Sequence, residues 1–140
     1  MDAIDHLIYC LLVSACRRLD RGELRATVLA KPYDIRPLAP FCPLDRAELE
    51  RRADRALRAG IRSVCLGDPD YPLRLARTDS CPPVLYFRGQ DAAARWNHPF
   101  SVTVVGSRTP SDYGLAVTRR IVAELARSDT LVISGLARGI

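Results

Sequence analysis

The sequence predicts an α/β fold in which a helical module over residues 1–60 precedes the opening βαβ part of a parallel sheet over residues 61–140. Two observations carry this prediction. In the first sixty residues, apolar side chains recur every three or four positions, which is the period of an amphipathic helix. After Phe100, a β-branched run, a turn, a helical stretch and a second β-branched run follow one another. That order is typical of a right-handed crossover between parallel strands.

The first sixty residues carry signals for three helices. Helical spacing predicts that the first helix has one apolar face, made of Ile4, Leu7, Ile8, Leu11, Leu12 and Ala15. Two capping boxes predict where the other helices begin, namely Asp20 with Glu23 and Asp45 with Glu48. Pro32 and Gly60 are placed to end these helices. The third helix interleaves arginines with acidic residues, which predicts an exposed, salt-bridged face containing Arg51, Arg52, Arg55 and Arg58.

Residues 61–99 change from helical to extended patterns. Short apolar runs predict strands over Ile61–Leu66 and Val84–Phe87. Gly67–Asp70 reads as a turn after the first of these strands, and Asp91–Trp96 reads as a helical turn after the second. This part of the chain therefore leads from the helical module into the βαβ segment.

The last forty residues predict strand, helix and strand. The strands are expected at Val102–Val105 and Leu131–Ile133, with Ser111 or Asp112 as the cap of the helix between them. Six residues are predicted on the face of this helix that covers the sheet: Gly114, Val117, Thr118, Ile121, Val122 and Leu125. One crossover helix leaves the other face of a parallel pair uncovered. We therefore expect this chain to be an incomplete piece of a longer α/β domain, or to be completed by a partner.

Each of the last two strands ends in a small-residue turn that carries one arginine. A glycine allows close backbone approach, a serine hydroxyl donates a hydrogen bond, and an arginine binds phosphate through two donors at once. The carboxyl ends of adjacent parallel strands meet at one edge of the sheet. We therefore expect two adjacent anion sites, able to hold two phosphates of one ligand, built from Gly106, Ser107, Arg108, Ser134, Gly135 and Arg138. The alternative is that these glycines serve only to start helices.

Composition narrows the partners and excludes several kinds of site. The net charge of +5 favours an anionic partner, although 20 of the 21 basic residues are arginine, a bias that genome composition also explains. The five cysteines show no Cys-x-x-Cys spacing and the chain has two histidines, so no metal site is predicted and the thiols are expected to be reduced. His6 is expected on the solvated surface, and no serine, cysteine or aspartate is expected to have a base partner. No leader or membrane-span pattern is evident, so we expect a cytoplasmic protein.

The motifs quoted above resemble the DNA-processing protein A family, known as DprA or Smf. The resemblance rests on Val104–Arg108, Ser111–Gly114 and Ile133–Ile140, and extends upstream to Gly67–Leu75 and Pro82–Gly89. It covers roughly Ala59 to Ile140. The resemblance implies that residues 61–140 are the start of a Rossmann-like domain that binds single-stranded DNA in a basic pocket.

The resemblance also implies a function. The protein would bind single-stranded DNA without catalysis and without a cofactor, protect incoming strands during natural transformation, and assist loading of the RecA recombinase. Arg108 would hold a DNA phosphate, Arg138 would add charge, and the glycines and serines of the two turns would donate hydrogen bonds. The resemblance is also compatible with a homodimer formed through regions beyond this chain.

Two other readings stay open at this point. One is a nucleotide-binding Rossmann-like enzyme of the lysine-decarboxylase-like phosphoribohydrolase type, which uses similar glycine-rich turns. Such an enzyme needs a catalytic acid on a Gly-Gly-x-Gly-Thr loop, which this sequence does not show. There is also no Walker lysine for a nucleoside triphosphatase. The other reading is a truncated product without function.

Overall fold

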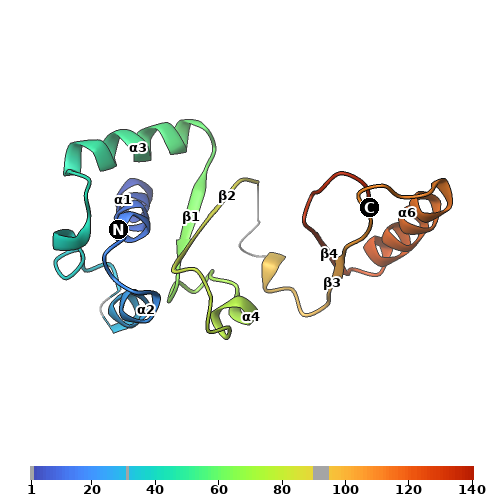
Figure 1. Ribbon diagram of the computed structural model, residues 1–140, viewed down its shortest axis with the longest axis horizontal. Helices are drawn as coiled ribbons and strands as arrows, with labels where there is room; N and C mark the ends of the chain where they lie inside the picture. The colour runs from blue at the N-terminus through green and yellow to red at the C-terminus, as the bar shows by residue number, and fades with distance from the viewer. Residues whose placement is uncertain (1, 31, 90–94) are drawn as a thin grey trace. The chain divides into compact units, whose positions relative to one another are not determined.

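The computed structural model describes residues 2–30, 32–89 and 95–140, which divide into two compact units at residues 1–93 and 94–140 (Figure 1). Each unit is described separately. Most of the helical turn expected over Asp91–Trp96 lies outside the described residues. The fold is mixed α/β, as the sequence predicts.

The first unit begins with the three predicted helices, α1 (Ala3–Ala15), α2 (Arg21–Ala30) and α3 (Arg46–Arg58), with a short 3-10 helix η1 (Ala39–Phe41) before α3. The first capping box is confirmed, because Asp20 and Glu23 each accept the other's backbone N–H, at 2.9 and 3.2 Å. Only one of the two hydrogen bonds of the second capping box is observed. Asp45 accepts the Glu48 N–H at 2.7 Å, but the Glu48 carboxylate pairs with neighbouring arginines.

Those pairs confirm the salt-bridged face of α3 for Arg51, Arg52 and Arg58, whereas the expected Arg55 forms no ion pair with any described residue. The exposed carboxylates and guanidinium groups of α3 lie 2.6–2.9 Å apart, in the pairs Arg46–Glu50, Arg51–Glu48, Arg52–Glu48 and Arg58–Asp54. Because solvent screens exposed ion pairs, each contributes little to stability, and together they support the helix without deciding the fold.

Helix α1 is the centre of the first unit's core. It packs against α3 and against strands β1 and β2, as Figure 1 shows. Because neighbours cover it from more than one side, its buried surface includes Tyr9, Cys10 and Val13 as well as the expected Leu7 and Leu12. The predicted apolar face of α1 was therefore partly wrong, because it left out Tyr9, Cys10 and Val13. It also included Ile4, which is 37% exposed.

Strands β1 (Arg62–Cys65) and β2 (Val84–Phe87) confirm the two predicted extended runs and pair antiparallel, with Cys65 opposite Val84. The connection between them holds the short helix α4 (Leu73–Ala76). The strand pair also packs on α1, and the Tyr86 and Ser14 hydroxyls lie 2.8 Å apart. The three helices and the β1–β2 pair thus belong to one compact unit.

A polar cluster joins α1 to the turn after β1, and it overturns the expectation that His6 is a solvated surface residue. The Nε2 atom of His6 lies 2.9 Å from the carboxylate of Asp68, which also accepts the Cys65 N–H at 2.6 Å and the hydroxyl of Tyr33. The hydrogen bond with Asp68 is the largest cause that raises the pKa of His6 to about 10. The other ring nitrogen of His6 faces Ser63 and Cys10, but a ring with so high a pKa is protonated at pH 7 and is not a base for either of them.

The second unit is a single βαβ crossover, as predicted. Strands β3 (Ser101–Val104) and β4 (Leu131–Ser134) pair parallel, with Val104 opposite Ser134, and helix α6 (Asp112–Arg127) connects them. Ser111 is the cap, since its hydroxyl accepts the Gly114 N–H at 3.1 Å.

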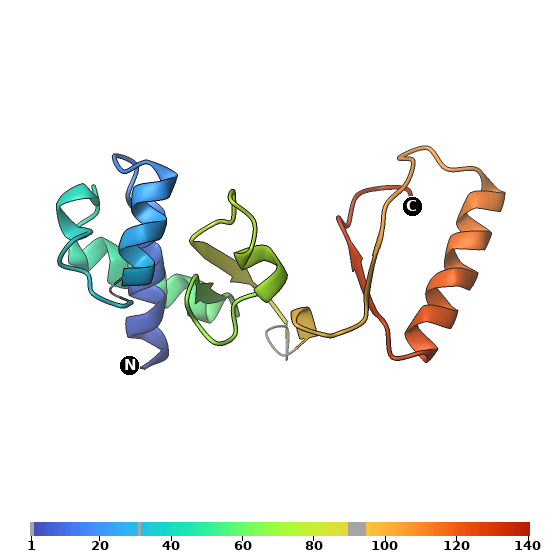
Figure 2. The ribbon, with the colours of Figure 1, turned by 90° about the horizontal axis from the view of Figure 1, so that it is seen from below.

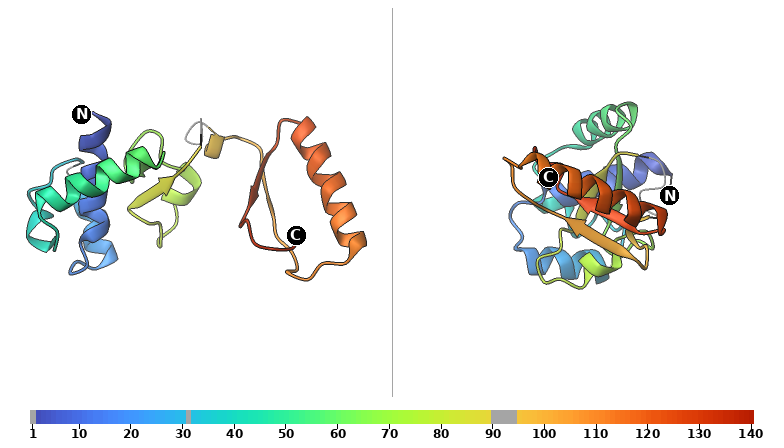
Figure 3. Two further views of the ribbon diagram at one scale, coloured as in Figure 1. Left: turned by 90° about the horizontal axis from the view of Figure 1, so that it is seen from above. Right: turned by 90° about the vertical axis from the view of Figure 1, so that its right-hand side faces the viewer.

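Helix α6 lies along one side of the strand pair, as Figures 2 and 3 both show. None of the described residues 95–140 is buried. Ile121, expected on the covered face of α6, is 52% exposed. Two strands are too narrow to cover all the apolar residues of a four-turn helix, so part of that face stays in water.

Across the described residues, no helix is long and apolar enough to span a bilayer. The same residues contain no group of three side chains suited to hold a metal ion.

The His6–Asp68 pair predicts a specific pH dependence of stability. In the unfolded chain His6 loses its proton near pH 6.5, whereas in the folded chain its pKa is about 10. The pair's contribution is therefore complete below about pH 6.5 and is lost as the pH rises towards 10. We expect the gap in urea midpoint between the wild type and Asp68→Asn to narrow steadily from pH 7 to pH 10. A gap that stays constant over this range would show that His6 is not held as a cation.

Candidate anion site at the ends of β3 and β4

The loops that follow β3 and β4 are in direct backbone contact. The N–H of Ile140 donates to the carbonyl oxygen of Ser107 at 3.1 Å. Gly139, which has a φ of +107°, lies so close to the first loop that a Cβ on it would overlap the Ser107 carbonyl oxygen and sit 2.8 Å from the Cα of Arg108. Glycine is therefore required here for two reasons, the left-handed φ and the lack of space.

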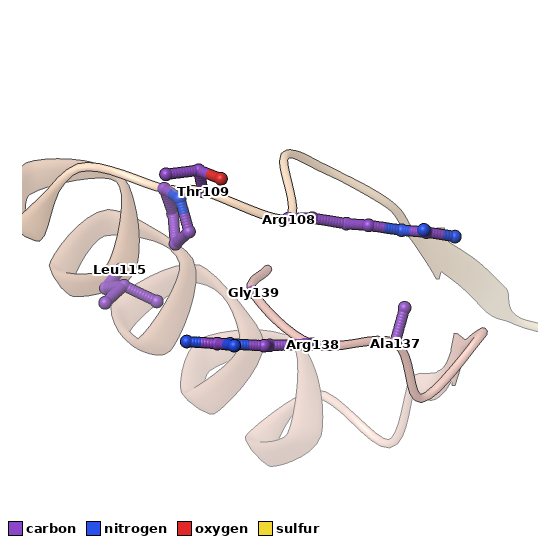
Figure 4. A pocket seen from close by; sticks show the side chains of 7 residues that line it. Arg108, Thr109, Leu115, Ala137, Arg138 and Gly139 are labelled. Carbon is purple, nitrogen blue, oxygen red and sulfur yellow. The ribbon is translucent and has the colours of Figure 1, made fainter.

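This contact brings both predicted arginines to one cavity. The cavity has a volume of about 970 Å³, and its walls come from the two loops and the first turns of α6: Arg108, Thr109, Pro110, Leu115, Ala137, Arg138 and Gly139. In Figure 4 the side chains of Arg108 and Arg138 extend in opposite directions from facing segments. The two guanidinium groups are thus set apart, which suits two anionic groups of one ligand better than a single phosphate.

Neither guanidinium is neutralised by the protein. Within the described residues, Arg108 and Arg138 have no ion pair and no hydrogen bond, and both side chains are exposed. By contrast, Arg127 at the far end of α6 pairs with Glu124 at 2.6 Å. Two unpaired arginines at one cavity make a concentrated positive field, which is the main electrostatic requirement for binding a polyanion.

The two predicted serines make the same kind of turn contact, although Ser107 lies in the loop after β3 and Ser134 is the last residue of β4. The Oγ of Ser107 accepts the N–H of Thr109 at 3.0 Å, and the Oγ of Ser134 accepts the N–H of Leu136 at 3.1 Å. These bonds to the residue two positions later stabilise each turn. Each hydroxyl keeps its own proton, so it remains able to donate to an anion.

The two predicted glycines differ in their surroundings. A Cβ on Gly106 would lie 2.7 Å from the Cβ and Cγ2 atoms of Ile140, so Gly106 makes room for that isoleucine. Around Gly135 no atom lies within 4 Å of the equivalent position. Gly135 thus leaves its backbone open to a ligand, whereas the side chain of Ile140 covers Gly106.

The N-terminus of α6 adds a smaller favourable contribution. Pro110 lines the cavity next to the cap Ser111, and unpaired N–H groups at a helix start attract anions by about 0.3–1 kcal/mol. Asp112 in the first turn offsets part of that attraction. No carboxylate, imidazole or thiol is among the described residues that line the cavity. The described lining is therefore of a kind that suits an anionic ligand.

Sequence reasoning found the two arginines but missed other residues of the cavity. Thr109, Pro110, Leu115 and Ala137 line it because they are neighbours of the arginines in the chain or lie one helical turn away. The sequence indicates Gly139 only as one position of the motif Ile133–Ile140. Its role in the loop contact depends on a residue 32 positions earlier, Ser107, and no local pattern indicates that contact.

The two loop glycines provide a matched test of this geometry. Gly139→Ala forces a Cβ against backbone atoms of the other loop, so we expect the second unit to lose at least about 2 kcal/mol of local stability. Gly135→Ala meets open space and should change stability by less than about 0.5 kcal/mol. Hydrogen exchange of the β3 and β4 amides measures both effects. Equal exchange rates in the two variants would rule out the loop contact.

Comparison with known proteins places this site inside a described family. The model of the family DNA recombination-mediator protein A matches residues 62–140, which include both loops. Protein Smf of Synechocystis is 43% identical over 74 residues, covering 52% of this chain and 19% of that protein. DNA processing protein DprA of Bacillus subtilis is 30% identical over 81 residues, covering 58% and 27%, and Protein Smf of Escherichia coli is 40% identical over 70 residues, covering 50% and 18%. The chain spans only about a fifth to a quarter of the length of these relatives.

Proposed function

The chain belongs to the DNA recombination-mediator protein A family, and from this premise we propose that its βαβ unit binds the backbone of single-stranded DNA at the cavity between the β3 and β4 loops. The observation that carries the proposal is that Arg108 and Arg138, from the ends of two adjacent strands, line one cavity without any protein partner among the described residues.

The separation of the two guanidinium groups supports a polymer as the ligand. Successive phosphates of a single strand are spaced along a flexible backbone, so two outward-directed cations can each take one of them. Ser107, Ser134 and the open backbone at Gly135 add uncharged donors beside them. Such contacts hold the sugar–phosphate chain and leave base identity unread.

One aromatic side chain near this site is free to contact a base. Tyr113, in the first turn of α6, is 79% exposed. Stacking on an aromatic ring is tolerant of sequence and contributes about 1–3 kcal/mol per base. The affinity of the proposed binding should therefore depend strongly on salt concentration and only weakly on base sequence.

The proposed role in the cell follows from the family. The protein protects incoming single strands in the cytoplasm and helps to load the RecA recombinase onto them in natural transformation and recombination. Its proposed partners are single-stranded DNA, RecA and, through regions outside residues 1–140, a second copy of the protein. No enzymatic step is part of the proposal.

Substitution of the two arginines tests the site directly. Arg108→Ala and Arg138→Ala should each weaken binding of the 1–140 chain to a fluorescent thymidine oligomer by about tenfold, because each removes a charge-assisted contact. Each should also reduce the slope of log affinity against log salt by about 0.7, since one phosphate is no longer neutralised. Fluorescence anisotropy over a salt series measures both quantities.

The matched control is Arg127→Ala, which removes an arginine of helix α6 that does not line the cavity. It should leave both the affinity and the salt slope nearly unchanged. An equal loss in all three variants would mean that net charge alone drives binding. Equal affinity of the wild type for single and double strands would remove the proposal.

A further inference from the structure

The first unit contains a cluster of reactive side chains that the proposed DNA site does not use. At its centre is the sulfur of Cys10, on the buried side of α1. The Nδ1 atom of His6 lies 3.8 Å from this sulfur. Cys65, His6 and Ser63 each lower the pKa of the Cys10 thiol, because donors close to a sulfur stabilise its anion.

The histidine of this cluster is held in one orientation. Its Nε2 atom donates to Asp68 at 2.9 Å, and the same carboxylate is fixed by the backbone N–H of Cys65 at 2.6 Å and by the Tyr33 hydroxyl. The Nδ1 atom is therefore directed at Cys10 and Ser63. Asp68 acts on Cys10 through His6, as a positioning group.

Charge decides between the two nucleophiles that His6 contacts. The hydrogen bond with Asp68, and next that with Cys10, raises the pKa of His6 to about 10, so the ring is a cation at pH 7. A protonated ring cannot take a proton from Ser63, which excludes that serine as an activated nucleophile. The same cation favours a thiolate. The hydrogen bond from Cys65, with those from His6 and Ser63, lowers the pKa of Cys10 to about 6 against the opposing effect of burial.

The tyrosines around the cluster stay neutral at pH 7, whereas the cavity beside His6 is also lined by Asp2 and Arg62. Burial is the largest cause that raises the pKa of Tyr9 and of Tyr86 to about 12, and it also raises that of Tyr33. The cluster therefore contains one thiolate, one imidazolium and one carboxylate, with a neutral thiol, Cys65, directly beside the thiolate.

Access to the sulfur is restricted by size. Cys10 is 0% exposed and Cys65 is 1% exposed, which shields both from bulky thiol reagents. However, His6 and Ser63 line an open cavity of about 670 Å³, together with Tyr33 and Arg62. Cys10 lies directly behind this wall, in contact with His6. Access of a reagent as small as hydrogen peroxide therefore requires a movement of the side chains that form this wall.

We propose that Cys10 is a site of oxidation by hydrogen peroxide and that Cys65 is its resolving thiol, so that oxidation forms a disulfide between α1 and β1. In the first step, the Cys10 thiolate attacks one peroxide oxygen, an S–O bond forms as the O–O bond breaks, and the leaving hydroxide takes a proton from the His6 cation. In the second, the Cys65 sulfur gives up its proton and attacks the sulfur of Cys10, and the sulfenic oxygen leaves as water. Two thiols and one peroxide thus give one disulfide and two waters.

The chain supplies an internal control for this chemistry. Cys16 is also buried and lies near Cys42. No histidine or carboxylate of the described residues contacts its sulfur. Burial raises the pKa of the Cys16 thiol to about 11. Peroxide reacts with thiolates and not with thiols. The Cys16–Cys42 pair should therefore stay reduced under conditions that oxidise Cys10 and Cys65.

Mass spectrometry of the 1–140 chain tests the proposal. After peroxide treatment, alkylation and digestion without reductant, we expect a disulfide-linked peptide pair containing Cys10 and Cys65, with Cys16 and Cys42 alkylated. In Cys65→Ser we expect a sulfenic acid on Cys10, which dimedone traps when it is added together with denaturant after the peroxide has been removed. Alkylated Cys10 and Cys65 in the wild type, at a peroxide dose that oxidises free glutathione, would overturn the proposal. So would oxidation of Cys16 and Cys42 at the same rate.

A pH profile tests the positioning role of His6 and Asp68. In the wild type, the rate of Cys10 oxidation should level off above about pH 6, where the thiol is already ionised. In His6→Gln and Asp68→Asn the rate should continue to rise beyond pH 8. At pH 7 the oxidation rate of Cys10 in each variant should be at least about threefold lower than in the wild type. The smaller fraction of thiolate outweighs the greater nucleophilicity of a more basic sulfur. A purely structural role would leave the midpoint of the profile unchanged, and an unchanged midpoint would contradict the assignment.

Discussion

The backbone contact between Gly139 and the loop of Ser107 is the constraint on which the candidate site depends. Parallel pairing of β3 and β4 only ensures that their two loops begin at the same edge of the sheet. The loops then have to approach closely enough for Arg108 and Arg138 to line the same cavity. A residue with any side chain at position 139 would separate them, so a position without chemistry of its own determines where the charged groups lie.

In the first unit, the carboxylate of Asp68 has a comparable role. It receives hydrogen bonds from α1, from the backbone of β1 and from the segment after α2, through His6, Cys65 and Tyr33. Partly buried charges are tolerated only where they are paired and hydrogen-bonded, and this carboxylate meets both conditions. The turn after β1 is thereby tied to a helix whose own residues lie near the start of the chain.

The sequence was informative where the signal was local. The strands and the caps at Asp20 and Ser111 follow from patterns of a few residues, and the parallel crossover follows from the order of elements over residues 101–134. All are observed within one or two residues of the expected positions. The family resemblance was also carried by short motifs, and the match over residues 62–140 confirms it.

The errors concern contacts between distant residues. His6 was placed on the surface because its neighbours in the helix are polar, whereas its partner Asp68 lies 62 positions away. The face of α1 was drawn too narrowly because the pattern does not show how many elements cover the helix. At the candidate site, the pairing of Gly106 with Ile140 is likewise a packing relation between two loops, and neither residue indicates it alone.

The lack of any buried residue among positions 95–140 affects how binding is coupled to order in the βαβ unit. A segment with so little enclosed apolar surface opens at a low free-energy cost, independently of the α1-centred core. A ligand that binds only the closed form stabilises it by mass action, by about 2.7 kcal/mol at a concentration one hundred times its Kd. For the proposed DNA ligand, binding would therefore be coupled to ordering of this unit, and the apparent affinity would report on both.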